Sequence, residues 1–459
     1  MEDEEDWRML DLDPRPQNAK HRPMIKTVAA AALLAILPLA GAKDKQLLHT
    51  FKKVQLTDKF WAEGATFGDY NKDGKMDIAS GPFWYEGPDF KKAHEFYPAN
   101  ATFKKKKADG TEETIPGFEG GLGVNNSYSD NFFAFTYDFN QDGWPDILVY
   151  GFPGKDASWY ENPKGRDGHW QKHFIFDVVD DESPDFMDVN GDGKPDILCC
   201  SGGCIGYATA DWNNPGQPWK FHPVSPKAGF QKFTHGIGCG DINGDGRVDI
   251  LEKDGWWEQP ASLAGDPVWT KHAFPFAQRG GAQMLVYDVN GDGLNDVITS
   301  LDAHGYGLAW YEQVKEDGKI TFKQHLILNP SPTPNKYGVS FSQLHSQALI
   351  DMDGDGLKDL VTGKRFWAHG QHGPDPASDG PPVLYWFKLT RPAKGQAEFV
   401  PYEIDGDSGV GTQVVAGFVS NKKWPDVVVG NKKGVFIIEH EAKNVSQAEW
   451  EQAQPKVNP

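Results

Sequence analysis

Cysteine is scarce in this chain, which has four cysteines among 459 residues. Cys199, Cys200, Cys204 and Cys239 are too few for a fold held together by disulfides, so they form at most a local staple, and free buried thiols are the alternative. Long segments with the 3.6-residue periodicity of amphipathic helices are also missing. The sequence therefore excludes a disulfide-rich scaffold and disfavours a helical fold.

Positive charge is in the minority, because 46 Lys and Arg stand against 65 Asp and Glu, for a formal net charge of −19. This balance argues against nucleic acid as a partner, since binding to a phosphate backbone depends on basic side chains. Neither a Walker loop nor a Ser-His-Asp order stands out, and the glycine-rich Gly120-Gly121-Leu122-Gly123 does not follow a strand of a βαβ unit. Nucleotide-dependent enzymes and serine hydrolases are therefore not favoured.

Long apolar runs are limited to residues 24–42 (MIKTVAAAALLAILPLAGA). Lys26 before the run and Ala40-Gly41-Ala42 after it are typical of a cleaved secretory signal, and the run is short for a membrane span. We predict a leader over residues 1–42, an exported protein (periplasmic, extracellular or cell-surface) and no stable membrane span after cleavage. Because residues 1–23 are a poor start for a signal, translation is expected to begin at Met24; an uncleaved anchor is the alternative.

Glycine and proline, by contrast, are abundant, with 51 and 32 residues, and aromatic residues make up 13% of the chain. This composition favours many short strands separated by turns. A nine-residue pattern, Asp-x-Asn/Asp-x-Asp-Gly-x-x-Asp, recurs along the chain, starting at Asp69, Asp138, Asp188, Asp241, Asp288 and Asp351. The recurrence predicts a repeat architecture.

The repeated loop has the chemistry of a Ca2+ site, because it offers oxygen ligands at its first, third, fifth and ninth positions and a carbonyl at its seventh. A strand follows the ninth position at once, without the last Glu and the helices of an EF-hand. The predicted ligands are Asp69, Asn71, Asp73, Asp77, Asp138, Asn140, Asp142, Asp146, Asp188, Asn190, Asp192, Asp196, Asp241, Asn243, Asp245, Asp249, Asp288, Asn290, Asp292, Asp296, Asp351, Asp353, Asp355 and Asp359. About six structural Ca2+ ions are expected, which would reduce the net charge to about −7.

A seventh copy, residues 418–426 (FVSNKKWPD), keeps only the last aspartate, so no Ca2+ is expected there. Each period contains a strand before the loop, one after it, an aromatic third strand such as SWYENP, and a fourth strand with a recurring histidine. Four short strands in each of seven periods are typical of propeller blades. We predict an all-β, seven-bladed β-propeller over residues 43–440, followed by a polar, mobile tail over residues 441–459.

The seventh period has no fourth strand of its own. Residues 47–56 (LLHTFKKVQL) stand before the first period without another obvious partner. We therefore predict that this N-terminal strand completes the last blade and closes the ring, which leaves only short, protected sheet edges.

The repeats resemble those of the FG-GAP/VCBS family, which form Ca2+-loop propellers. The segments THGIGCGDINGDG, LDAHGYGLAWYEQ and SQLHSQALIDMDGDG further resemble the propeller of aldos-2-ulose dehydratases. That resemblance implies elimination of water from ketosugars. The cupin domains that accompany the propeller in those enzymes are missing, so an isomerase step is not expected.

The mouth opposite the loops is the expected place for function. Residues about six positions before each loop should surround that mouth, and they include Glu63, Glu182, His235 and His345, a set that could bind a catalytic divalent metal. A polar, water-filled channel is the alternative. The turns between second and third strands should add the candidate catalytic residues His304, His369, Lys253, Lys364 and Arg365.

Two functions remain open at this point. One is a carbon-oxygen lyase or dehydratase that acts on ketosugars or uronates by β-elimination, with His235 or His345 as the proton acceptor. The other is a noncatalytic extracellular module that binds or adheres to glycan or protein. A small sugar or glycan ligand is expected, and the oligomeric state is not predicted. The fourth-strand histidines are expected to be packing or surface residues, namely His94, His173, His222, His272 and His325.

Overall fold

The computed structural model describes residues 45–458 except 100–101, 108 and 117–127. The leader predicted over residues 1–42 lies outside the described residues. Within the described part of the chain, no helix is long and apolar enough to cross a membrane. The four cysteines are free thiols and three of them are buried. The structure therefore shows free thiols in place of a local disulfide.

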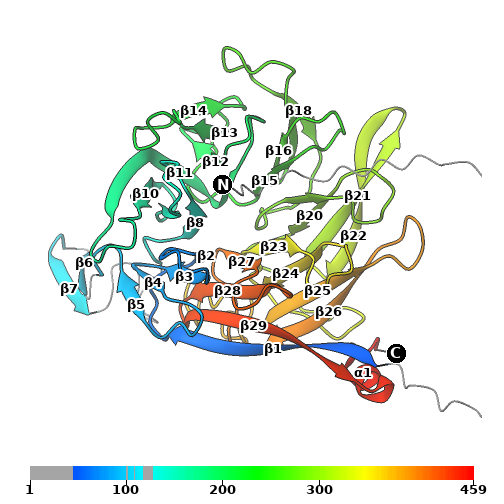
Figure 1. Ribbon diagram of the computed structural model, residues 1–459. Helices are drawn as coiled ribbons and strands as arrows, with labels where there is room; N and C mark the ends of the chain where they lie inside the picture. Colours follow the sequence, from blue (N-terminus) through cyan, green and yellow to red (C-terminus); the bar gives the residue numbers. More distant parts are fainter. Residues whose placement is uncertain (1–44, 100–101, 108, 117–127, 459) are drawn as a thin grey trace, which may run out of the picture. The chain divides into compact units, whose positions relative to one another are not determined.

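The described chain is almost wholly antiparallel β-structure, in successive four-stranded sheets that follow one another around a common centre (Figure 1). Sheet 1 consists of β2 (Thr66–Gly68), β3 (Asp77–Ser80), β4 (Phe83–Tyr85) and β5 (Ala93–Glu95). Sheets 2 and 3 are continuous and consist of β8 (Phe133–Tyr137), β9 (Asp146–Tyr150), β10 (Lys155–Glu161), β11 (Gln171–Met187), β12 (Asp196–Ser201), β13 (Cys204–Thr209) and β14 (Lys220–Pro223). The long strand β11 pairs with β10 through its first half and with β12 through its second.

The remaining sheets repeat this pattern. Sheet 4 consists of β15 (Ile237–Gly240), β16 (Asp249–Glu252), β17 (Gly255–Glu258) and β18 (Thr270–Ala273). Sheet 5 consists of β19 (Leu285–Tyr287), β20 (Asp296–Ser300), β21 (Leu308–Glu316) and β22 (Lys319–Leu328). Sheet 6 consists of β23 (Gln347–Ile350), β24 (Asp359–Gly363), β25 (Leu384–Thr390) and β26 (Glu398–Asp405). Sheet 7 consists of β27 (Val414–Gly417), β28 (Asp426–Asn431), β29 (Gly434–Val445) and β1 (Gln46–Thr57).

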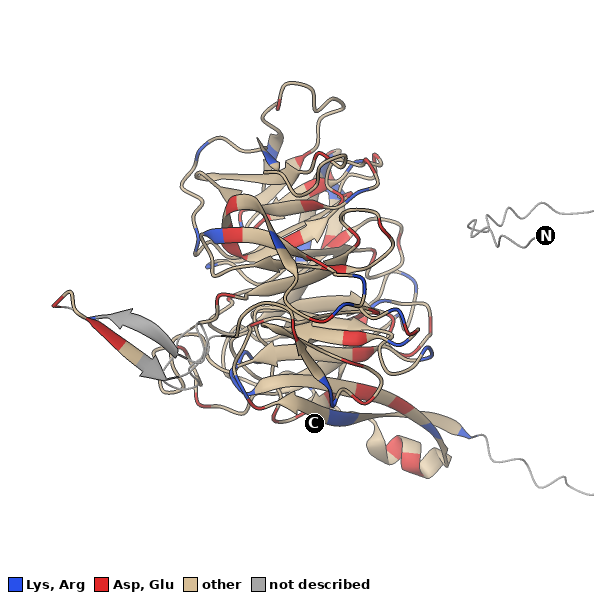
Figure 2. Cartoon of the chain, turned by 60° about the vertical axis from the view of Figure 1, so that its left-hand side comes forward, with Lys and Arg blue, Asp and Glu red and all other residues tan. Residues whose placement is uncertain are grey.

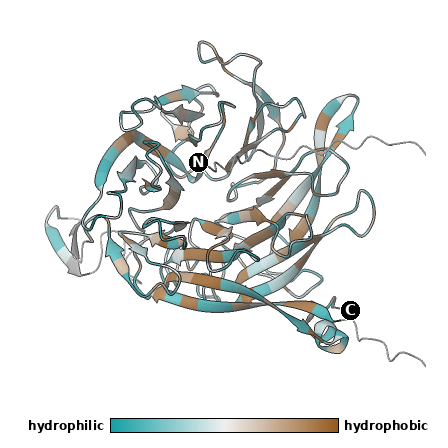
Figure 3. Ribbon diagram, in the orientation of Figure 1, coloured by the Kyte–Doolittle hydropathy of each residue, from teal (hydrophilic) through white to brown (hydrophobic). Residues whose placement is uncertain are grey.

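The second strand of each sheet is buried on both faces, as in β9 (DILVY) and β24 (DLVTG). Alternation of apolar and polar residues is absent there because neighbouring sheets cover both sides, and the apolar clusters span adjacent sheets. Figure 3 shows the apolar positions gathered in the strands and hydrophilic residues in the connecting loops. The core therefore lies between sheets.

The fourth-strand histidines belong to this packing, as predicted. The rings of His173, His272 and His325 stack on third-strand tryptophans with centroids 4.1, 4.1 and 4.2 Å apart. Each of these three also bonds a third-strand glutamate at 2.7 or 2.8 Å. His94 stacks on Trp84 in the same way, and His222 lies against Tyr207. Their recurrence therefore has a structural cause.

The two ends of the chain meet in sheet 7. Strand β1 pairs with β29 from Gln46↔Val445 to Thr57↔Val435, and the expected strand over residues 47–56 lies within it (Figure 1). Strand β29 continues past the domain boundary expected at residue 440, and helix α1 (Gln447–Ala453) follows it. The polar, mobile tail predicted over residues 441–459 is therefore wrong in this part, because strand pairing and a Ser446 capping box order the backbone.

A hairpin of β6 (Thr102–Lys106) and β7 (Glu112–Pro116) is inserted between sheets 1 and 2. Its two strands form a sheet of their own that pairs with none of the seven sheets, and the coloured part of β7 in Figure 2 includes acidic residues. The repeat pattern did not predict this hairpin, because the hairpin occurs in a single period.

The repeated loops connect the first and second strands of their sheets. In the loop of residues 351–359, the Asp351 carboxylate accepts the backbone N–H groups of Gly354, Asp355 and Gly356 at 2.8–3.2 Å. Asp359 accepts the N–H groups of Met352 at 3.0 Å and of Leu389 on β25 at 2.8 Å. The loop is thus folded around its carboxylates and is fastened to the third strand.

Candidate functional site

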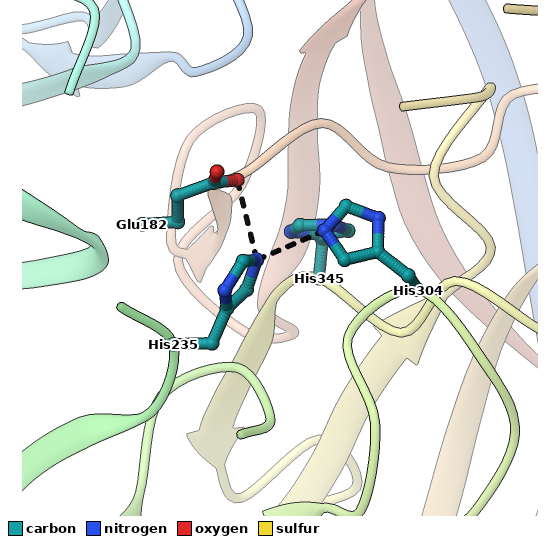
Figure 4. Close-up of side chains that lie close together, drawn as sticks. All are labelled: Glu182, His235, His304 and His345. Carbon is teal, nitrogen blue, oxygen red and sulfur yellow. Dashed lines mark hydrogen bonds and ion pairs between the residues drawn. The ribbon is translucent and has the colours of Figure 1, made fainter. Parts of the chain in front are cut away.

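Four side chains from different sheets converge on one place in the structure. One ligand atom from each of Glu182, His235, His304 and His345 lies within 4.8 Å of the others. They come from four different sheets: Glu182 from β11, His235 from the residue pair before β15, His304 from the β20–β21 turn, and His345 from just before β23. Figure 4 shows the four side chains pointing toward one another. We call these four residues the mouth group.

The shortest contacts of the mouth group involve His235. Its Nε2 atom lies 3.0 Å from Nε2 of His304 and 3.4 Å from a carboxylate oxygen of Glu182. The ring of His345 lies 5.4 Å from that of His235 and 4.6 Å from that of His304, between centroids. Glu182, His235 and His345 are buried, and His304 is partly exposed.

Local backbone features aim two of these side chains. The pairing of β11 with β12 is interrupted between Asp180 and Asp185, and Asp181 adopts φ 88°, so Glu182 lies in a bulge that turns it toward the centre. Gly280 stands against His235: a Cβ atom there would lie 2.3 Å from the His235 carbonyl oxygen. Only glycine permits this close approach of sheet 5 to His235.

The hydrogen bonds around the mouth group leave its ligand atoms available. Nδ1 of His235 donates to the carbonyl oxygen of Phe233 at 2.9 Å, so Nε2 of the neutral ring is an acceptor. Among the described residues, His345 Nδ1 is buried without a hydrogen-bond partner. Glu182 Oε2 has only the long contact to His235 Nε2 at 3.4 Å, and His304 Nδ1 has only a long contact to Asp375 at 3.6 Å. Three imidazoles, one carboxylate and a buried nitrogen without a partner fit a divalent metal that prefers nitrogen and oxygen ligands.

The electrostatics agree with this fit. Burial, reinforced by the charge of Arg365, lowers the pKa of His345 well below 6.5. Burial also lowers the pKa of His304. Burial alone would lower the pKa of His235, but the contact in which its ring donates to the Glu182 carboxylate, together with the charges of Glu182 and Asp181, outweighs burial and raises the pKa. His304 and His345 are therefore neutral near pH 7 and would lose no proton on binding a metal.

Glu63 was predicted in the metal set and lies outside the mouth group. Two cations hold it instead: Arg365 lies 3.1 and 3.3 Å from its two carboxylate oxygens, and Lys432 forms a short ion pair with it. All three side chains are buried, so the two positive charges keep the pKa of Glu63 below its ordinary value against the effect of burial. His304, predicted as a catalytic residue, takes its place.

Sequence reasoning missed Lys432. It lies in the turn between β28 and β29, the position in sheet 7 that corresponds to the Lys364–Arg365 turn of sheet 6. The loop of this sheet, residues 418–426, is the degenerate copy, so the loop pattern gives no signal for this turn. Burial lowers the pKa of Lys432 to about 8.

Arg365 links this ion pair to the mouth group. Its guanidinium lies 3.9 Å from Glu182 and 3.4 Å from Nε2 of His345. It is fully buried, with the rings of Tyr128 and Phe132 at 5.9 and 5.7 Å. Of the predicted cations, Arg365 is the one that contacts the mouth group.

His369 and Asp375 form a pair beside the mouth group. The His369 ring stacks on that of His304, with centroids 4.6 Å apart, and its Nδ1 atom lies 3.0 Å from Asp375. Burial raises the pKa of Asp375, but the hydrogen bonds from His304 and His369 outweigh it and lower the pKa to about 2. The side chain of His369 is 44% exposed, so this imidazole is oriented by a carboxylate and open to solvent.

The two predicted lysines lie elsewhere. Lys364 is buried and donates to the carbonyl oxygens of Arg365 and Ser378 at 3.3 and 3.4 Å, and burial lowers its pKa to about 8. Lys253 forms a short ion pair with Asp254 at the surface. Neither contacts the mouth group in the described part of the chain.

Part of the chain matches a known repeat family, and two known proteins are similar to it at low identity. The sequence pattern of the FG-GAP-like repeat matches residues 138–199 and 188–252. This part of the chain carries FG-GAP-like repeats. A T-cell immunomodulatory protein homolog of Plasmodium falciparum (isolate 3D7) is 23% identical over 213 residues, 40% of this chain and 28% of that protein. The integrin alpha-PS3 of Drosophila melanogaster is 25% identical over 167 residues, 31% of this chain and 14% of that protein. The chain thus matches less than a third of either relative.

Several solved structures resemble the chain at low identity. They include an Agrocybe aegerita lectin that recognises terminal N-acetylglucosamine (18% identity, TM-score 0.41, 84% of this chain and 87% of that one). The BP39L lectin of Burkholderia pseudomallei gives 14% identity, a TM-score of 0.42 and coverage of 83% and 96%. The rhamnogalacturonan lyase YesW gives 13% identity, a TM-score of 0.36 and coverage of 85% and 72%. Likenesses at this level carry no conclusion about ligand or reaction.

Proposed function

We propose that this protein is an exported carbon-oxygen lyase whose mouth group binds a divalent metal and which acts on an oxidised sugar by β-elimination. The observation that carries the proposal is the convergence of Glu182, His235, His304 and His345 within 4.8 Å. Three imidazoles and a carboxylate are a donor set that leaves a divalent ion with open positions for substrate oxygens. The dehydratase-like segments of the sequence contribute His235, His304 and His345 to this set.

The proposed scaffold is a seven-bladed propeller held by about six Ca2+ ions. The pairing of β1 with β29 supports the closure of the last blade by the N-terminal strand. The loops support Ca2+, because each complete copy presents three or four aspartates and one or no asparagine on a short turn.

The proposed reaction needs an acidic C–H bond in the substrate and a base that accepts its proton. A bound ion would polarise the ketone or carboxylate oxygen of the substrate and so acidify the neighbouring C–H bond. His369, oriented by Asp375 and open to solvent, is the proton acceptor. As the proton leaves, a C=C bond forms and the β C–O bond breaks; the proton on His369 passes to the departing oxygen, which is released as water or an alcohol.

A substrate screen tests this proposal. Purified protein is incubated with 1,5-anhydrofructose, 3-ketoglycosides and polyuronates, and the unsaturated product is followed by ultraviolet absorbance. We expect one class to react, His345→Ala to lose both the bound metal and activity, and His369→Gln to lose activity while it keeps the metal. His325→Ala, a fourth-strand packing histidine, is the matched control. No absorbance with any substrate would contradict the proposal.

A noncatalytic extracellular binding module is the second candidate. The similarity to an integrin alpha chain, 25% identity over 167 residues, favours it. It predicts that glycan or protein binding survives His345→Ala and His369→Gln, and that metal analysis finds Ca2+ alone.

A further inference from the structure

A cavity of about 450 Å³ opens between sheets 1 and 2. Its volume is within the range of small-molecule sites. The lining side chains combine aromatic rings with hydrogen-bonding groups, among them Trp61, Tyr97, Asn131, Asp156, Tyr160 and Lys172. None of these residues belongs to the mouth group or to the Ca2+ loops, so neither proposed role accounts for the cavity.

The aromatic part of the cavity is rigid and mostly buried. Tyr97 and Tyr160 are stacked with centroids 5.0 Å apart, and the Trp61 ring meets Phe83 edge-on at 5.1 Å. Rings held in this way offer apolar faces at little further entropic cost. Such faces suit the C–H faces of sugar rings.

The polar part of the cavity contains a buried acceptor that lacks a donor. Asn131 is 3% exposed, and its amide nitrogen donates to the Tyr97 hydroxyl oxygen at 3.3 Å. Its Oδ1 atom has no hydrogen-bond partner among the described residues. Oδ1 is itself buried, so a ligand hydroxyl would reach it only by a small turn of the Asn131 amide, and the donated hydrogen bond would then satisfy this acceptor.

Charge at the cavity is balanced. Asp156 accepts from the Ser158 hydroxyl at 2.6 Å and pairs with Lys172 at 3.2 Å. The carboxylate is thus held in place with lone pairs to spare, which suits neutral ligands that donate several hydroxyl protons. A strongly charged ligand would find no net complement in this pair.

The cavity and the mouth group share a wall. Trp61 follows Phe60, whose ring lies 4.7 Å from the Lys432 ammonium, and Asn131 precedes Phe132, which lies 5.7 Å from the Arg365 guanidinium. The N–H group of Glu63 donates to the Asn131 carbonyl oxygen at 2.9 Å. One residue along each segment therefore separates the cavity from the side chains around the mouth group.

We infer that the cavity between sheets 1 and 2 is a subsite for a neutral sugar ring, and that the substrate is a glycoside of two or more linked sugars. Its oxidised ring would lie at the mouth group and a later ring of the glycoside, beyond the residues that separate the two sites, would lie in the cavity. The inference rests on the proposed function for the first ring alone; binding of a neutral ring in the cavity does not depend on it.

Substrate length tests the inference. We compare kcat/KM for a methyl 3-ketoglucoside with that for 3-keto-disaccharides and 3-keto-trisaccharides, in the wild type, Asn131→Leu and Tyr97→Ala. We expect the wild type to prefer one of the longer glycosides at least tenfold, and this ratio to fall toward one in both variants. Thermal unfolding shows whether each variant is folded. Tyr97 is only partly buried, so Tyr97→Ala is the variant expected to keep its fold if Asn131→Leu does not.

Binding separates the two proposals. Calorimetry with unreactive cellobiose and maltotriose is carried out on the wild type and both variants. Binding to the wild type that the variants lose, without turnover of any substrate, supports the subsite and contradicts the lyase. Turnover without a length preference, or a preference that the variants retain, overturns the subsite. Neither turnover nor binding overturns both.

Discussion

At the residue scale, the ninth position of the repeated loop is informative because it survives where the other ligands do not. Asp426, in the degenerate copy, accepts the N–H groups of Ser420 at 2.6 Å and of His440 on β29 at 2.8 Å. Asp359 makes the equivalent bonds in a complete copy. This aspartate therefore fastens the loop to the third strand, whether or not an ion is bound.

The role of Asp426 can be separated from Ca2+ binding. We expect Asp426→Ala to lower the free energy of unfolding by about 1–3 kcal/mol, because two or more buried N–H groups lose their acceptor. The number of bound Ca2+ ions should stay the same. Asp355→Ala, at an exposed fifth position, should instead remove one ion and, in EDTA, leave stability almost unchanged. Urea unfolding and Ca2+ titration measure both; a changed stoichiometry in Asp426→Ala would refute the assignment.

The buried ion pair of Glu63 gives a second residue-scale prediction. Glu63→Gln leaves the buried charges of Arg365 and Lys432 without their partner, so we expect a loss of about 3–5 kcal/mol in the free energy of unfolding. Glu439→Gln, which breaks a surface pair with the exposed Lys52, should cost about 1 kcal/mol or less. Equal effects in urea unfolding would show that Glu63 is not paired in solution.

The residues of the mouth group were partly predictable. Counting back from each loop identified Glu182, His235 and His345, because the loop fixes the register of its strand. Glu63 satisfied the same count but lies outside the mouth group, because Arg365 and Lys432 reach it from sheets 6 and 7. Such contacts join residues hundreds of positions apart, and no local pattern specifies them.

At the element scale, strand β1 is the feature that joins the two ends of the described chain. Deletion of residues 45–57 leaves β29 with an unpaired edge and removes the contacts of half-buried Leu48, Phe51 and Val54. We expect the free energy of unfolding to fall by at least about 3 kcal/mol, and aggregation to increase.

Deletion of residues 447–459 is the matched control for this truncation. No residue of α1 is buried, so its removal should cost about 1 kcal/mol or less. Thermal unfolding and light scattering measure both truncations. If the two deletions had similar effects, β1 would not be the strand that holds sheet 7 together.

The elements themselves were predicted unevenly. The repeat fixed the order of strands in each sheet, since every loop is bounded by strands of the same composition. The β6–β7 hairpin and the end of β29 were missed because each occurs once. The short helix α1 depends on the capping box of Ser446 and Glu449, a signal outside the repeat.

At the scale of the whole molecule, stability should depend on Ca2+ and pH together. Burial raises the pKa of the ninth-position aspartates to about 6 for Asp77 and Asp249 and to about 7 for Asp146, Asp196, Asp296 and Asp359, above the ordinary 3.8. Without ions, the folded chain therefore binds more protons than the unfolded chain between about pH 4 and 7. The stability that these aspartates contribute to the folded chain is therefore present at low pH, and it is lost as the pH rises through their pKa in the folded chain.

We expect Ca2+ to reverse this trend, because ions bound at the proposed sites would bind the ionised carboxylates and compete with protons. The increase in Tm on replacing EDTA with Ca2+ should therefore be small at pH 5 and large at pH 7.5. Each site should contribute about 2.7 kcal/mol when the ion is at a hundred times its Kd. Mg2+, which is smaller and demands octahedral geometry, should stabilise less at both pH values. A Ca2+ increment that is equal at the two pH values, or larger at pH 5, would mean that the raised carboxylates are not the Ca2+ ligands.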